Sequence, residues 1–276
     1  TWTVPTGWTI TGGQGTTSVT VTTGAYGNNG NISVYASNTC GNSAPNTLAV
    51  TVLPGTPATP GTITGTTAQC PGVTGQIYSI TAIANASTYT WAVPSGWSIT
   101  AGQGTTSISV TTGIAGQNGN ITVTAGNSCG TSSPNSLSVT VQPGTPATPG
   151  TITGNDAQCP SLTGQIYSIS PITNATTYTW TVPTGWSITA GQGTTSLTVT
   201  TGTTGLNGNI TVTAGNSCGT SAASSLPVTV LPGIPATPGT ITGTASVCPG
   251  ITGLVYSIST VTNATTYTWS VPTGWT

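Results

Sequence analysis

Residues that could do acid, base or metal chemistry are almost missing from this chain of 276 residues. It has no Lys, Arg, His or Glu, and Asp156 is its one acidic side chain. General acid–base catalysis needs a group that titrates near the working pH, and a Ser or Cys nucleophile needs a base to activate it. Calcium sites need several oxygen ligands, and zinc sites need clustered Cys or His. We therefore expect a protein that is not an enzyme and has no catalytic residue, metal site or cofactor.

The same lack of charge limits the partners of the chain. Binding to nucleic acid at physiological salt relies on Lys and Arg to neutralise phosphates, and the sequence contains neither. A membrane-spanning helix needs a run of about 20 apolar residues, and no such run occurs. We expect no nucleic-acid partner and no membrane insertion. Because the first residue is Thr1 rather than Met, we also expect a piece of a longer protein.

Tryptophans and cysteines recur with one period. The tryptophans form two series with a step of 89 residues: Trp2, Trp91, Trp180 and Trp269, then Trp8, Trp97, Trp186 and Trp275. The cysteines follow the same step in two series: Cys40, Cys129 and Cys218, then Cys70, Cys159 and Cys248. This period exceeds the roughly 20 to 50 residues of solenoid repeats, so it indicates a tandem array of small whole domains.

Proline-rich connectors divide the array. Three stretches, 53–65, 142–154 and 231–243, share the pattern PATPGTITG. Because proline fixes φ and lacks a donor, these are short, stiff connectors. They predict two complete domains, over residues 57–144 and 146–233. A partial domain with the C-terminal strands would occupy residues 1–54, and one with the N-terminal strands would occupy residues 235–276.

Apolar and polar residues alternate within each complete domain. Tyr89, Trp91 and Val93 alternate with polar residues, and Ile108 and Val110 do so again. Such runs are typical of strands with one buried face, and glycine turns such as AGQG separate them. The pattern suggests about seven strands in about 88 residues, as in an immunoglobulin-like domain. We predict an all-β fold of tandem immunoglobulin-like antiparallel β-sandwiches.

The repeated motifs also resemble those of a known family. YTWAVPSGW, GQGTTSISVTTG and GNITVTAGNSCGTSSPNSLSVTV are similar to PKD-like and Ig-like repeats of very long secreted surface adhesins of Bacteroidetes. The resemblance extends over every repeat. It implies an exported cell-surface protein of the kind delivered by the type IX secretion system, including gliding-motility adhesins similar to SprB.

The two tryptophan series have different interpretations. Trp91 points the same way as Tyr89 from the third predicted strand, where immunoglobulin-like cores hold a large aromatic residue. We therefore predict core positions for the first series: Trp2, Trp91, Trp180 and Trp269. The second series, Trp8, Trp97, Trp186 and Trp275, supplies candidate surface or ligand aromatics. Trp97 follows the VPSG turn, so it could plug the end of the sandwich, pack on a neighbour or offer a face to a sugar.

Periodic cysteines in an exported β-domain predict disulfides rather than a metal site. Cys70 should lie near one end of its sandwich and Cys129 near the other, about 20 to 30 Å away, which is too far for a bridge. A bridge between neighbouring domains, Cys70 with Cys218, is therefore one prediction. The alternative is a bridge inside each domain, Cys70 with Cys129 and Cys159 with Cys218, which requires a different arrangement of strands.

Thr and Ser alternate with the apolar residues and form the solvent face of each strand. Because charge normally discourages pairing of sheet edges, an uncharged array should associate readily with itself. We predict a structural repeat segment of an extracellular, cell-surface adhesin or filament, acting as a rod, stalk or self-associating fibre. Its partners would be neighbouring repeats, further copies and surface glycans. The alternative is an array of carbohydrate-binding modules that uses Trp97, Trp186 and Tyr26 as stacking platforms.

Overall fold

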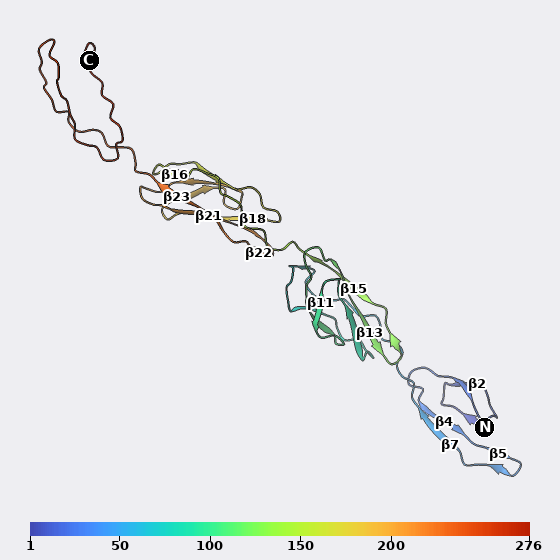
Figure 1. Cartoon of the computed structure of the whole chain (residues 1–276). Helices are drawn as coiled ribbons and strands as arrows, with labels where there is room; N and C mark the ends of the chain where they lie inside the picture. The colour runs from blue at the N-terminus through green and yellow to red at the C-terminus, as the bar shows by residue number, and fades with distance from the viewer. The chain divides into compact units, whose positions relative to one another are not determined.

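A computed structural model describes all residues of the chain, Thr1 to Thr276. The secondary structure consists of strands and turns without a helix, so the predicted all-β fold is confirmed. Contacts divide the chain into two compact units, Thr1–Pro143 and Gly144–Thr276. Figure 1 labels strands of both units. The chain has no helix with the length and hydropathy needed to span a membrane.

The first complete domain lies in the first unit and has two sheets. Its strands are β8 (Ala68–Gln69), β9 (Gln76–Ser79), β10 (Thr88–Ala92), β11 (Ser98–Ala101), β12 (Ser107–Thr111), β13 (Gly119–Asn127), β14 (Gly130–Thr131) and β15 (Asn135–Val141). One sheet has the order β10-β13-β15-β8, with β14 paired to β13, and the other has the order β11-β12-β9. All pairs are antiparallel except β15 with β8.

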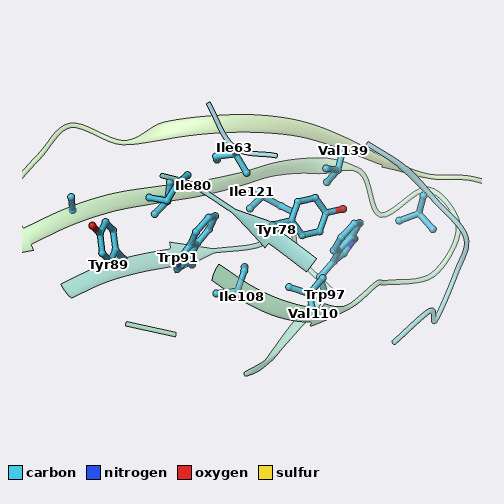
Figure 2. Close-up of a cluster of buried hydrophobic side chains, with 13 residues drawn as sticks. Ile63, Tyr78, Ile80, Tyr89, Trp91, Trp97, Ile108, Val110, Ile121 and Val139 are labelled. Carbon is cyan, nitrogen blue, oxygen red and sulfur yellow. The ribbon is translucent and has the colours of Figure 1, made fainter. Parts of the chain in front are cut away.

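The core of this domain fills the space between the two sheets. Burial alternates along β10 and β12, so that Tyr89, Trp91, Ile108 and Val110 point inward, and Figure 2 shows these side chains gathered between the strands. Outward positions carry Thr and Ser, which suit a pleated, hydrated surface. The alternation in the sequence thus fixes which face of each strand is buried.

The second complete domain repeats this arrangement in the second unit. Its strands are β16 (Ala157–Gln158), β17 (Gln165–Ser168), β18 (Thr177–Thr181), β19 (Ser187–Ala190), β20 (Ser196–Thr200), β21 (Gly208–Asn216), β22 (Gly219–Thr220) and β23 (Ser224–Val230). The sheet orders are β16-β23-β21-β18 and β17-β20-β19. Trp180 takes the core place of Trp91, and Leu197 that of Ile108.

The terminal segments contain only part of this fold. Residues 1–54 form short strands: β1 (Trp2–Thr3), β2 (Thr9–Gly12), β3 (Thr20–Thr22), β4 (Gly30–Val34), β5 (Ser37–Asn38), β6 (Gly41–Asn42) and β7 (Asn46–Val50). They pair as β1-β4-β7, β2-β3 and β5-β6. Residues 235–276 contain no extended strand, and their one β-bridge is the isolated antiparallel pair Thr242↔Ser257.

The core prediction for the first tryptophan series is wrong for two of its members. Trp2 is only half-buried, and Trp269 is 48% exposed. In the first complete domain, Trp91 pairs with Val123 of β13, 32 residues further along the chain. Residues 235–276 form no named strand, so Trp269 has no such strand partner to cover its indole.

Candidate functional site

Both tryptophans of the stretch TYTWAVPSGW are buried structural residues. The exposed fraction is 2% for Trp91 and 7% for Trp97. The Nε1 of Trp91 donates to the carbonyl of Thr105 at 2.8 Å, and that of Trp97 to the carbonyl of Gln117 at 2.9 Å. A buried indole N–H needs such a partner. These rings are thus held at both their apolar and their polar ends.

A tight turn brings Trp97 back into the core. The backbone N–H of Trp97 donates to the carbonyl of Pro94 at 3.1 Å, and Gly96 has φ +83°, as a type II turn requires. The indole then lies 6.5 Å, centroid to centroid, from the ring of Tyr78 at an interplanar angle of 54°. This tilted geometry is favourable for aromatic pairs.

The hypothesis of a sugar-stacking surface therefore fails for Trp97 and for Trp186, its equivalent in the second domain. Trp186 is 7% exposed and lies 6.5 Å from the ring of Tyr167. Neither indole presents an open face. The other members of the series, Trp8 and Trp275, lie in the terminal segments, where Trp8 is half-buried and Trp275 exposed.

Gln103, in the turn AGQG, binds both the backbone N–H and the backbone carbonyl of Trp91. The N–H of Trp91 donates to Oε1 of Gln103 at 3.0 Å, and Nε2 of Gln103 donates to the carbonyl of Trp91 at 2.9 Å. Gln192 makes the same two bonds with Trp180, at 2.9 and 3.0 Å, and Gln14 makes them with Trp2, at 2.7 and 2.9 Å. The amide thus occupies the place of a neighbouring strand.

Glycines allow the backbone of this turn to place the glutamine side chain against Trp91. Gly102 has φ +85°, and a Cβ added there would lie 2.0 Å from the carbonyl oxygen of Ser107. The glycines of AGQG predict a turn between strands, but they do not indicate the role of its glutamine. The available signal was its constant offset of 12 residues from a core tryptophan, as in Gln103 after Trp91.

The hydroxyl of Tyr78 belongs to a buried polar network. It donates to the carbonyl of Thr66 at 2.6 Å and accepts from Nε2 of Gln69 at 3.0 Å. Burial raises the pKa of Tyr78, and the bond from Gln69 offsets part of this rise. A neutral, doubly bonded phenol of this kind holds strands together, and no neighbouring side chain is a base that could activate it.

The cysteines fall into two chemical states. Cys70 and Cys218 are disulfide-bonded. The other four, Cys40, Cys129, Cys159 and Cys248, are free and exposed. The bridges inside each domain, Cys70 to Cys129 and Cys159 to Cys218, are therefore not formed. Cys70 and Cys218 are the two cysteines named by the prediction of a bridge between domains.

An asparagine anchors the connector at the start of the first complete domain. Nδ2 of Asn127 donates to the carbonyl of Gly55 at 2.9 Å and to that of Asn85 at 3.0 Å, and its Oδ1 accepts from the N–H of Cys129 at 2.8 Å. The preceding residues are also held, because the N–H of Val52 donates to Oδ1 of Asn29 at 2.8 Å. In the second domain, Asn216 repeats the bonds of Asn127, to Gly144, Asn174 and Cys218.

Comparison with known proteins identifies the repeats. The model of the PKD-like domain matches residues 1–50, 56–139, 145–228 and 234–276. A search of curated proteins finds no match. Among solved structures, the I-band fragment I67–I69 of titin is 13% identical, with 75% of this chain and 76% of that chain covered and a TM-score of 0.37.

Two further structures have the same kind of similarity. The N-terminal eight Ig domains of DSCAM are 14% identical, with 82% of this chain and 29% of that chain covered and a TM-score of 0.37. The FN1–FN3 domains of chicken CNTN1 are 12% identical, with 72% and 74% covered and a TM-score of 0.31. Because the four matches to the family model span nearly the whole sequence, the chain belongs to the PKD-like domain family, as a tandem array of its repeats.

Proposed function

We propose that this chain is a structural repeat segment of an extracellular, cell-surface adhesin or filament, and that it is not an enzyme. It would act as a rod or stalk, or as a self-associating fibre, in surface adhesion or gliding motility. Tandem PKD-like repeats and a disulfide are typical of extracellular domains. The observation that carries the proposal is the use of the aromatic and amide side chains, which are turned inward to hold each sandwich together.

The same inward contacts occur in both complete domains. Trp91 and Trp180 bind the glutamine of the following turn through equal pairs of bonds. Tyr78 and Tyr167 both bind a buried glutamine through their hydroxyls. The buried Trp, Tyr and Gln side chains thus stabilise their own domain, and they do so in the same way in both copies. Such a repeat suits a mechanical role better than a recognition role.

The anchored connector supports a load-bearing role. Val52 and Gly55 are each held by an asparagine side chain, which leaves Leu53 and Pro54 between the two anchoring bonds. Proline further restricts the backbone of this short span. A connector with few free torsions passes tension from one repeat to the next with little stretching of its own.

The alternative function, an array of carbohydrate-binding modules, has no repeated exposed aromatic to support it. Trp97 and Trp186 are buried. Tyr26 is 68% exposed, but Ala115 and Thr204 take its place in the complete domains. We therefore do not propose binding of glycans by the repeats.

Two experiments test the proposed function. Single-molecule stretching of the full chain under reducing conditions should show two unfolding steps, one for each complete domain. Each step should lengthen the chain by about 270 Å, since about 88 residues extend by up to about 3.6 Å each and the folded domain is about 40 Å long. Antibodies raised against the chain should label the outside of intact cells. Featureless extension, or labelling only after cells are broken open, would refute the proposal.

A further inference from the structure

The strand β10 is the longest edge strand of the first complete domain. It pairs with β13 on one side only, and its other side ends the sheet. An exposed edge presents free N–H and C=O groups that can pair with a strand of another molecule. Proteins usually prevent this with charged side chains, and this chain has none on the strand. A second copy of the same chain, with a formal net charge of −1, would meet almost no repulsion.

The outward backbone groups of β10 are nevertheless occupied. Gln103 takes both the N–H and the carbonyl of Trp91. Two residues earlier on the same strand, the N–H of Tyr89 donates to the carbonyl of Gly104 at 3.2 Å. In the second domain, the carbonyl of Tyr178 accepts from the N–H of Gly193 at 3.0 Å. The turn therefore lies along the edge and makes the bonds that an added strand would make.

The remaining edges are short or irregular. β8 has only two residues, and the pairing of β11 shifts register between Ile99 and Ala101. At the end of β9, Ser79 is bridged to Thr64. Short strands, bulges and covered ends all discourage strand addition. β10 has none of these features, so the turn is its protection.

We propose that Gln103 and Gln192 close the β10 and β18 edges against pairing with a second copy of this chain, in the place that charged residues fill elsewhere. The inference goes beyond the proposed function, because it states which surface the repeats do not use for association. Any association of copies would then use a surface other than these two edges.

The test replaces both glutamines by alanine in the full chain. Q103A/Q192A should associate at a concentration at least tenfold lower than the parent chain, as measured by analytical ultracentrifugation. The amide of Trp91 should exchange with deuterium faster than in the parent when the variant is dilute, and should be protected again when it is concentrated. This reversal is the signature of a newly paired edge.

Two control variants separate an open edge from simple loss of stability. Q103E/Q192E keeps the acceptor for the tryptophan N–H, loses the donor and puts charge on the edge, so it should associate no more than the parent. Q117A removes a glutamine that does not bind β10. Its side chain accepts a 2.9 Å hydrogen bond from the N–H of Ile114, and the variant should also associate like the parent. An unchanged association of Q103A/Q192A, or an equal increase in either control, would overturn the proposal and leave the structural role of the repeats untouched.

Discussion

Replacing Trp97 by alanine should destabilise the first complete domain severely. The indole is buried, pairs with Tyr78 and donates to the carbonyl of Gln117, so the substitution removes packing and leaves an acceptor unpaired. Truncation of a buried Trp to Ala costs about 3 to 5 kcal/mol. A domain of about 88 residues has a free energy of unfolding of about 4 to 13 kcal/mol. The variant should therefore lose about a quarter or more of this free energy.

Hydrogen exchange measured by mass spectrometry after pepsin digestion resolves the two domains within the intact chain. Peptides of residues 57–144 should lose about 4 kcal/mol of protection in Trp97→Ala, while those of residues 146–233 stay unchanged. Trp97→Phe, the matched control, keeps a ring but loses the N–H, and should cost about 1 to 2 kcal/mol. A loss below about 1 kcal/mol in Trp97→Ala would contradict the burial argument. Sugar binding that disappears in a fully stable variant would revive the carbohydrate-binding alternative.

Three more predictions follow from the cysteines, the tyrosines and the connector. A bond between Cys70 and Cys218 shields most of both domains from a pulling force, so their unfolding steps should be almost absent in the oxidised chain and return on reduction. Mass mapping should recover that linked pair. Two full steps under both conditions would exclude the pairing. Burial raises the pKa of Tyr78 and Tyr167 above 10.0, so the folded state holds these protons more tightly than the unfolded chain. Their contribution to stability should be full below about pH 10 and should be lost as the pH rises through the folded pKa. The Tm of the reduced chain should therefore be nearly constant between about pH 5 and 8. A change in Tm near neutral pH would contradict this. Asn127→Ala should free the carbonyls of Gly55 and Asn85, lower stability by about 1 to 2 kcal/mol and speed amide exchange near Gly55, whereas exchange at Gly144, which Asn216 holds, should not change.

The alternation of side chains made the strands predictable, and turn geometry did not follow from it. Tyr89 and Trp91 are inward because every second residue of a strand shares a face. Trp97 lies after a turn, where period-two alternation no longer applies, so its burial depends on the φ of Gly96. Gln103 acts through a bond to the backbone of a residue 12 positions earlier, which no local pattern reveals. Trp269 illustrates a third limit, because the burial of a strand residue depends on a partner strand far along the chain.

The burial of the aromatic side chains has a consequence for the resistance of the complete domains to proteolysis. Trypsin-like proteases need a Lys or Arg in their specificity pocket, and the chain offers none even when it is unfolded. Chymotrypsin-like proteases need a large apolar residue, and in the complete domains all the Tyr and Trp side chains are buried. Digestion at these residues must therefore wait for a domain to open. We expect trypsin-like proteases to leave the chain intact, and chymotrypsin-like cleavage at these Tyr and Trp residues to begin only when a sandwich opens.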